Sequence, residues 1–184
     1  MRVTTGLARG RNLEAPKGLD TRPSSDMTKQ AVFNIIQNYV EASVFLDLFA
    51  GSGQMGIEAL SRGAKHAEFV DSDPRAIEAI KANLKHCDLS DHARVSKMEA
   101  VSFLQNNSQK FDIVFMDPPY QQNMIEQVLE LAAEKMNEGG IILCETQRQE
   151  TLPEKAGNYV LDKTYLYGKA KITMYREIEL QEEE

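Results

Sequence analysis

The segment Asp117-Pro118-Pro119-Tyr120 combines the residue types best suited to chemistry in this 184-residue chain. Two prolines remove two backbone donors and stiffen the turn, which leaves carbonyl oxygens pointing outward. A carboxylate and a fixed carbonyl are two acceptors, and they match the two N–H donors of an exocyclic amino group. The aromatic ring beside them can stack on a base taken out of its helix. The alternative is a proline-rich turn with a capping Asp, but the pattern favours an amino group as the target.

A glycine-rich segment, residues 47–56, precedes this motif by about 60 positions. Gly51, Gly53 and Gly56 have the GxGxxG spacing, after an apolar run and before a helical pattern. Glycine allows a tight turn and lets a ligand approach the backbone closely. We therefore expect an adenosine-containing cofactor here, with a purely structural turn as the alternative.

A second carboxylate, Asp71, follows the next apolar run and can accept both ribose hydroxyls. Asp73 is a competitor, but Asp71 directly follows the run and is preferred. Glycines and carboxylate together permit either NAD or S-adenosylmethionine. Asp47, four residues before Gly51, favours the latter, because its methionine moiety carries a cationic amino group. The loop also has no Lys or Arg for a pyrophosphate, although backbone N–H groups alone could bind one.

Short apolar runs alternate with helical patterns from residue 43 onward, which predicts a parallel sheet covered by helices on both faces. Because ligands bind beyond the carboxyl ends of such strands, Asp47, Asp71 and Asp117 should face one crevice. A helix is expected over 27–40, and residues 1–23 read as a β-hairpin or arm. The remaining expectations are strands at 44–46, 67–70, 94–96, 111–116 and 141–144, helices at 55–62, 74–86, 100–105 and 125–136, and an antiparallel hairpin of 159–167 with 170–175.

Composition excludes several classes of protein. With 42% hydrophobic residues the chain is not disordered throughout. No apolar run approaches the roughly 18 residues that span a bilayer, and no secretory signal opens the chain, so we expect a cytoplasmic protein. Cys87 and Cys144 are far apart, which fits a reducing compartment, and the three histidines have no metal-ligand spacing, so no metal is expected.

The net charge of −7 argues, taken alone, against a nucleic-acid partner. Residues 177–184 carry five glutamates, however, and without them the charge is about −2. The first 30 residues carry six basic and three acidic side chains. Such a local basic surface can hold phosphates, since screening confines its field to roughly 10 Å. A solvated terminal segment explains the same charges equally well.

Taken together, Asp117 to Tyr120 and the upstream glycines resemble the S-adenosylmethionine-dependent amino-methyltransferases. Within these, the whole chain is similar to the RsmD-type 16S rRNA guanine-N2 methyltransferases of bacteria. It departs from them in having Asp71, where Glu is frequent, and Glu99 near the adenine position. The matching segments are Arg9-Gly10-Arg11, Thr21 to Asp26, Phe33-Asn34, Asp47 to Gly53, Glu58 to Ala64, Asn83-Leu84 and Asp117 to Tyr120.

The resemblance implies a class I, Rossmann-like methyltransferase fold. Its sheet would be mostly parallel and seven-stranded, with an antiparallel C-terminal hairpin and an N-terminal β-hairpin arm. The implied divisions are an RNA-contacting arm at 1–23, a methyltransferase domain at 24–178 and an acidic tail at 179–184. The implied partner is 16S rRNA, in the small ribosomal subunit or its precursor, and we expect a monomer that does not bind membranes.

The implied reaction moves the methyl group of S-adenosyl-L-methionine to N2 of a guanine and leaves S-adenosyl-L-homocysteine. Acceptors on both N–H groups would help the nitrogen become pyramidal, and we assign them to the Asp117 carboxylate and the Pro118 carbonyl. The implied catalytic residues are Asp117, Pro118, Pro119 and Tyr120. Implied cofactor contacts are Asp47, Phe49, Ala50, Gly51, Ser52, Gly53, Asp71, Ser72, Met98, Glu99, Ala100 and Asp117, and implied RNA contacts are Arg9, Arg11, Arg22 and Tyr120.

Three other functions stay open from the sequence. A DNA adenine or cytosine amino-methyltransferase would use the same motifs, but this chain is short and has no obvious target-recognition domain. An NAD-dependent oxidoreductase would have no use for residues 117–120. A non-catalytic rRNA-binding assembly factor would keep the fold and bind RNA without transferring a methyl group.

Overall fold

The computed structural model describes residues 1–18, 25–119 and 122–178 of the chain. Three sequence-based expectations fall outside these ranges: Arg22, Tyr120 and the acidic tail at 179–184. Within the described ranges, the helices are all too short or too polar to cross a membrane.

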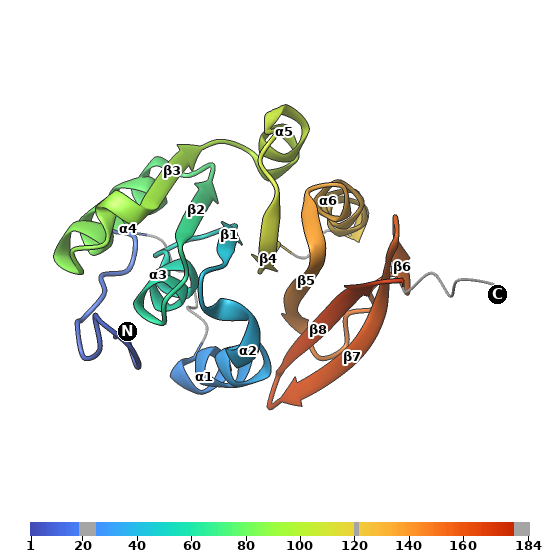
Figure 1. Cartoon of the computed structure of the whole chain (residues 1–184), viewed down its shortest axis with the longest axis horizontal. Helices are drawn as coiled ribbons and strands as arrows, with labels where there is room; N and C mark the ends of the chain where they lie inside the picture. The colour runs from blue at the N-terminus through green and yellow to red at the C-terminus, as the bar shows by residue number, and fades with distance from the viewer. Residues whose placement is uncertain (19–24, 120–121, 179–184) are drawn as a thin grey trace.

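Eight strands form one sheet in the order β3-β2-β1-β4-β5-β8-β7-β6 (Figure 1). The first five in this order are parallel, and β8, β7 and β6 pair antiparallel to their neighbours. The bounds are β1 Val44–Leu48, β2 His66–Asp71, β3 Ala93–Lys97, β4 Phe111–Met116, β5 Met136–Gln147, β6 Lys155–Ala156, β7 Tyr159–Tyr167 and β8 Ala170–Glu177. The predicted fold class is confirmed, but the sheet has one strand more than the seven expected, because the two-residue β6 is too short to give a sequence period.

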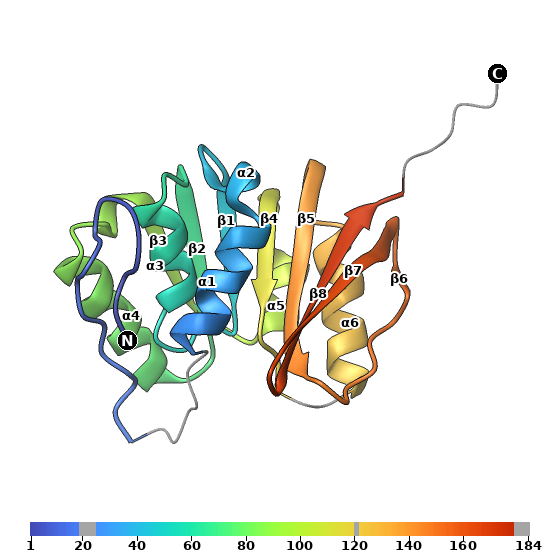
Figure 2. The same cartoon turned by 90° about the horizontal axis from the view of Figure 1, so that it is seen from below.

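Helices cover both faces of the sheet (Figures 1 and 2). Alternate residues of each strand point to opposite faces, so the sheet has two cores. In β1, Phe45 packs with α1, α3 and α4, while Leu46 packs with α5 and α6. The bounds are α1 Asp26–Ile35, α2 Gln37–Val40, α3 Gln54–Ser61, α4 Pro74–His86, α5 Ala100–Asn106, α6 Gln122–Ala133 and the 3₁₀ helix η1 Ser90–His92.

Two expected elements differ from those observed. The helix expected over 27–40 is divided at Ile36, whose backbone leaves the helical region at φ −102° and ψ 9°. The helix expected over 125–136 ends at Ala133, and Met136 instead begins β5, which continues through Gly139-Gly140. A Cβ on Gly140 would lie 2.9 Å from the carbonyl oxygen of Asp112, so glycine permits this irregular pairing with β4.

The described part of the N-terminal arm, residues 1–18, contains turns and one isolated antiparallel bridge between Arg2 and Asn12. It is therefore not the pair of regular strands that a β-hairpin would have. The N–H groups of Val3 and Leu13 do donate across the arm, to the carbonyl oxygens of Arg11 and Met1 at 2.9 Å. The pairing stops there because donors nearer the turn pair with α3 instead: the N–H of Leu7 donates to the carbonyl oxygen of Ser61 at 2.9 Å, and the N–H of Thr4 to Glu58 at 3.0 Å.

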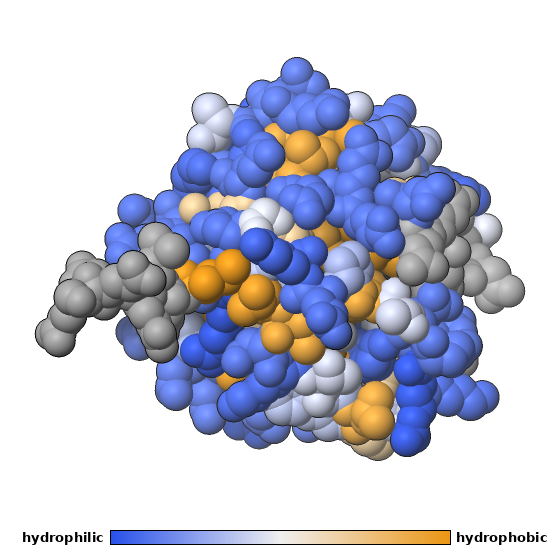
Figure 3. Space-filling model, turned by 90° about the vertical axis from the view of Figure 1, so that its right-hand side faces the viewer, coloured by the Kyte–Doolittle hydropathy of each residue, from blue (hydrophilic) through white to orange (hydrophobic). Residues whose placement is uncertain are grey.

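The far end of the sheet is formed by β6 and β7 and is mostly hydrophilic, with an interrupted band of hydrophobic residues (Figure 3). β6 pairs with Tyr159 and Val160 of β7. Farther along β7, Asp162 and Lys163 place charges on the strand. Charged edge positions discourage pairing with a second sheet.

Candidate active site

Three carboxylates lie at the carboxyl ends of neighbouring strands. Asp47 is the fourth residue of β1 and is buried, Asp71 ends β2, and Asp117 directly follows β4. β1 lies between β2 and β4 in the sheet, with Leu48 opposite both Val70 and Met116. The structure therefore brings these three predicted residues together at one edge.

Burial, together with the charges of Asp71 and Asp117, raises the pKa of Asp47 to about 8, although a hydrogen bond from the Gly56 N–H at 2.9 Å acts to lower it. A carboxylate held among other carboxylates in a buried position favours an added cation, which would lower its pKa again. This environment fits the cationic amino group that the sequence predicts for Asp47.

Asp117 is partly buried, and burial together with the charge of Glu145 raises its pKa to about 7. Glu145 lies within β5, one position past Cys144, which pairs with Met116 in register, so Glu145 lies beside the end of β4, where Asp117 follows. Pro118 is buried and Pro119 exposed. Sequence reasoning missed Glu145, although it follows the apolar run 141–144 in the same way that Asp117 follows 111–116.

The glycine-rich loop connects β1 to α3 through three residues with positive φ: Phe49 at 64°, Gly51 at 57° and Gly53 at 79°. A Cβ on Gly51 would meet no atom within 4 Å, so this side of the loop is open. Gly56 has a different role: a Cβ there would lie 2.4 Å from the ring of Phe69, so this glycine lets α3 pack on β2. Ala50 and Ser52 complete the loop and are buried.

The structure separates the two competing carboxylates after β2. Asp71 accepts hydrogen bonds from the N–H groups of Gly51 and Asp73, both at 2.9 Å, and so belongs to the loop. Its oxygens have further acceptor capacity for ribose hydroxyls. Asp73 caps α4 and pairs with Arg75 at 2.7 Å, and hydrogen bonds from Arg75 lower the pKa of Asp73 to about 2. Asp71 as the ribose ligand remains a prediction, and the structure favours it over Asp73 because Asp73 is already engaged by Arg75.

The segment after β3 lies next to Asp71. The N–H of Met98 donates to the carbonyl oxygen of Asp71 at 3.0 Å, and the Met98 side chain is 39% exposed. Ala100 is buried at the start of α5, while Glu99 before it is exposed. Ser72 is exposed directly after β2. Of the residues expected near the adenine, Met98 thus lies beside Asp71 with its side chain partly exposed.

The two predicted RNA contacts that lie in described residues have different environments. Arg9 is exposed at the turn of the arm. Arg11 donates to the carbonyl oxygen of His86 and pairs with Asp88 at 3.3 Å, so its guanidinium holds the arm to the end of α4. Arg9 is the better placed of the two to meet a phosphate.

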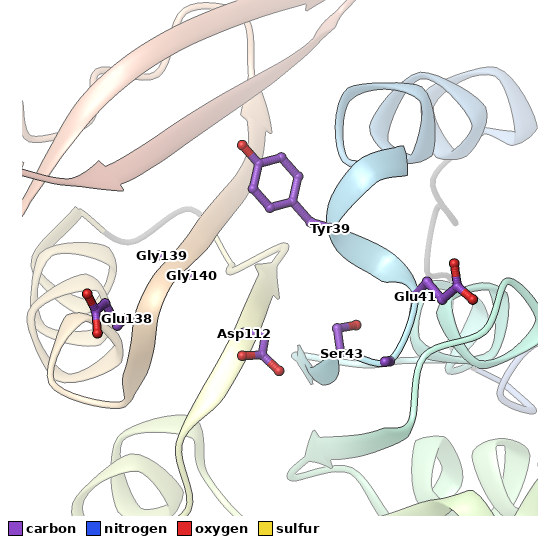
Figure 4. Close-up of a pocket in the computed structure, with 8 residues that line it drawn as sticks. Tyr39, Glu41, Ser43, Asp112, Glu138, Gly139 and Gly140 are labelled. Carbon is purple, nitrogen blue, oxygen red and sulfur yellow. The ribbon is translucent and has the colours of Figure 1, made fainter.

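A separate pocket of about 300 Å³ lies at the opposite edge of the sheet, beside the amino ends of β1 and β4 (Figure 4). Asp112 in its wall accepts hydrogen bonds from the N–H of Val44 at 2.7 Å and from the Asn137 side chain at 3.0 Å. These bonds tie the strand ends together. Ligands of open α/β sheets bind at the carboxyl edge, so this pocket is not the predicted site.

Comparison with known proteins gives consistent matches over nearly the whole chain. The Bacillus subtilis (strain 168) protein YlbH, named as a candidate rRNA methyltransferase, is 40% identical and aligns with 96% of this chain and 98% of its own. Ribosomal RNA small subunit methyltransferase D of Haemophilus influenzae is 35% identical, over 96% and 93% respectively. The Escherichia coli structure of yhhF, described as a candidate methyltransferase, is 31% identical with a TM-score of 0.86 and covers 96% of this chain and 97% of its own.

A more distant structure shares the fold alone. An RNA methyltransferase from Salinibacter ruber in complex with S-adenosyl-L-homocysteine is 13% identical, with a TM-score of 0.68 over 89% of this chain and 98% of its own. The model of one protein family matches residues 1–176. The resemblance seen in the sequence is thus confirmed, and the chain belongs to the family described as Conserved hypothetical protein 95.

Proposed function

We propose that this chain transfers a methyl group from S-adenosyl-L-methionine to the N2 amino group of a guanine in 16S rRNA. The observation that carries the proposal is the placement of Asp117-Pro118, at the end of β4, beside the buried Asp47 and its glycine-rich loop. The relative named ribosomal RNA small subunit methyltransferase D supports the class of substrate. The match over nearly both entire chains supports carrying that class over to this one.

The residues around the loop fit S-adenosyl-L-methionine. Asp47 would hold the amino group, Asp71 the ribose hydroxyls, and Met98 with Ala100 one side of the adenine. The negative charge gathered at Asp47, Asp71 and Asp117 matches a cofactor with an ammonium and a sulfonium group. When bound, it supplies an activated methyl group whose sulfonium loses its positive charge on transfer. The remaining cofactor contacts that we propose are Phe49, Ala50, Gly51, Ser52, Gly53, Ser72, Glu99 and Asp117.

On the substrate side, the amino nitrogen of guanine is a poor nucleophile because its lone pair is delocalised into the ring. The Asp117 carboxylate and the Pro118 carbonyl accept its two N–H groups, which favours a pyramidal nitrogen and stabilises charge that develops on it. Holding that nitrogen in line with the methyl group supplies a further part of the rate. A carboxyl group with a pKa of about 7 can also take the released proton near neutral pH. Pro119 would stiffen the turn and Tyr120 would stack on the guanine.

Positive charge is available to RNA in two places: on the N-terminal arm, whose turn lies beside the C-terminal ends of α3 and α4, and at the turn between β7 and β8. Arg9 is exposed on the arm, and Lys169 is exposed at the turn between β7 and β8. The N–H of Arg148 donates to the carbonyl oxygen of Lys169 at 2.9 Å, which holds this turn beside the carboxyl end of β5. The other RNA contacts that we propose are Arg11 and Arg22. We accordingly propose residues 1–23 as an RNA-contacting arm on a methyltransferase domain at 24–178, with an acidic tail at 179–184.

The test is methylation with isotope-labelled S-adenosyl-L-methionine of small ribosomal subunits from cells that lack this enzyme, followed by nucleoside mass analysis. We expect N2-methylguanosine, and loss of the signal with Asp117→Ala. Duplex DNA serves as the competing substrate. Labelled adenine or cytosine in DNA, or RNA binding without any methyl transfer, would contradict the proposal. The protein in this proposal acts as a cytoplasmic monomer.

A further inference from the structure

Residues 1–14 form a strap that lies across α3 and α4 (Figures 1 and 2). On α3, the Glu58 carboxylate accepts from the N–H groups of Thr4 and Thr5 at 3.0 and 3.1 Å. Ser61 accepts from the N–H of Ala8 at 3.0 Å and donates to the carbonyl oxygen of Thr5 at 2.6 Å. The strap thus contacts both helices that follow the proposed cofactor segments.

Docking of the strap is highly specific. Glu58 is buried and lies 3.4 Å from Lys29, which has no exposed side-chain area, and 3.0 Å from Arg62. Lys29 also donates to the carbonyl oxygen of Arg2 at 2.5 Å. Although burial alone would raise the pKa of Glu58, hydrogen bonds from Thr4 and the nearby cations lower it. Undocking would remove the strap's hydrogen bonds from this buried cluster of charged groups, which disfavours the undocked state.

On α4, Asn83 joins the strap to the glycine-rich loop. It is 2% exposed, and it accepts from the N–H of Glu14 at 2.8 Å and donates to the carbonyl oxygen of Glu14 at 2.9 Å. The same amide nitrogen donates to the carbonyl oxygen of Ser52 at 2.9 Å. Ser52 lies between Gly51 and Gly53, and its hydroxyl is 3.5 Å from the sulfur of Met1. A single buried side chain therefore contacts both the strap and the loop.

We propose that Asn83 is a positioning residue, and that docking of the strap through Asn83 preorganises the loop for S-adenosyl-L-methionine. This inference rests on the function proposed above and adds that strap docking and cofactor binding are coupled. Phe49, Gly51 and Gly53 have left-handed backbones, and Phe49 does so at a steric cost. A loop already held in this conformation loses less entropy when a ligand binds. Because coupling is reciprocal, bound cofactor also stabilises the docked strap.

Two glycines of the strap provide a matched pair of variants. A Cβ on Gly6 would lie 1.7 Å from the carbonyl oxygen of Ser61, so Gly6→Ala must lift the strap from α3. Gly10 has a similar φ, 85° against 88°, but a Cβ there meets nothing within 4 Å. Gly10→Ala therefore carries the same backbone strain without the collision. Neither residue is among the proposed cofactor contacts.

The measurement is the dissociation constant of S-adenosyl-L-homocysteine by calorimetry, without RNA and well below the melting temperature. We expect Gly6→Ala to weaken binding about tenfold, and Gly10→Ala to bind within about twofold of the original chain. Proteolysis of the strap is followed in parallel. If Gly6→Ala exposes the strap to protease yet binds with an unchanged constant, the coupling is refuted.

The role of Asn83 in ligand binding is distinguished from its effect on stability by a control variant at another site. Asn83→Ala and Asn83→Asp both remove the donors to Glu14 and Ser52, and each should weaken binding of the same ligand about tenfold and raise KM for the cofactor more than it lowers kcat. Asn137→Ala removes a side-chain hydrogen bond to Asp112 at the opposite edge and should lower the melting temperature without changing the constant. Equal constants for Asn83→Ala and the original chain would refute the role of Asn83. Absence of binding by the original chain would instead refute the proposed function.

Discussion

The two edges of the sheet both carry carboxylates at strand ends, but the protein treats them differently. At the amino edge, Asp112 receives hydrogen bonds from the backbone of β1 and from Asn137 and so serves the fold (Figure 4). At the carboxyl edge, burial and neighbouring carboxylates raise the pKa values of Asp47 and Asp117. Negative charge is therefore neutralised by structural donors at one edge and left for a ligand at the other.

Removing one carboxylate from each edge tests this difference most directly. Asp117→Ala should lower kcat by about 10²–10³-fold, since an acceptor that acts on the developing charge is lost, and should weaken binding of S-adenosyl-L-homocysteine far less. Asp112→Asn should keep kcat and lower the free energy of unfolding by about 1–2 kcal/mol through one weakened hydrogen bond. Methyl transfer and urea unfolding check both expectations. A larger kcat loss in Asp112→Asn than in Asp117→Ala would reverse the assignment of the edges.

Asp47→Asn separates function from stability at the carboxyl edge. It should weaken cofactor binding about 10- to 100-fold, because the partner of the cationic amino group loses its charge. It should also stabilise the ligand-free chain. The pKa of Asp47 is about 8 in the folded chain, against 3.8 for an ordinary Asp, so the folded form binds more protons between these values and its stability falls as pH rises.

The stability measurement for Asp47→Asn is thermal unfolding at several pH values between 4 and 9. The gain over the original chain should be absent near pH 4 and reach about 1–3 kcal/mol at pH 8. The oxygen of Asn can still accept from the Gly56 N–H, so this contact serves as an internal control. An equal loss of stability at every pH would mean that Asp47 is a structural carboxylate like Asp112.

The pH dependence of turnover gives a third comparison. Burial and Glu145 raise the pKa of Asp117 to about 7, and only the ionised carboxylate accepts through both oxygens. Activity should therefore rise with pH through the neutral range and level off above it. The cationic cofactor should lower the midpoint in kcat relative to kcat/KM for the cofactor, because only the second quantity reports the cofactor-free chain. Loss of this slope in Asp117→Asn would assign it to Asp117, whereas a slope that persists unchanged would assign it elsewhere.

The sequence predicted the positions of the carboxylates at the carboxyl edge better than it predicted the contacts of the arm. The period of the strands alone placed Asp47, Asp71 and Asp117 at neighbouring strand ends, because parallel strands share one direction. The contacts that hold the arm, by contrast, join residues that are far apart in the sequence. Glu58, Ser61 and Asn83 were recognised as matching segments, but their partners lie more than 50 positions away, and no periodicity relates them.

Other features escaped prediction for local reasons. β6 has two residues, too few to show alternation. Met136 fits the period of α6, yet it pairs with Phe111 as the first residue of β5, because tertiary pairing overrides a single apolar position. Asn83 had a usable signal: it is a polar residue on the inward face of a helix whose neighbours Ile80 and Leu84 are buried. Such a residue needs buried partners, and here they are the strap and the loop.

A last pair of variants changes one glycine at each edge and is expected to affect stability alone. Gly56→Ala adds a Cβ 2.4 Å from the ring of Phe69, and because both lie in the packed core between α3 and β2 the cost should be about 1–3 kcal/mol. Gly139→Ala adds a Cβ that meets nothing within 4 Å but keeps a φ of 73°, so its cost should be about 1 kcal/mol of backbone strain alone. Urea unfolding ranks the two. If both substitutions lowered the free energy of unfolding equally, α3 would have to move away from the sheet at little cost. The glycine-rich loop before so mobile a helix would then not be preorganised.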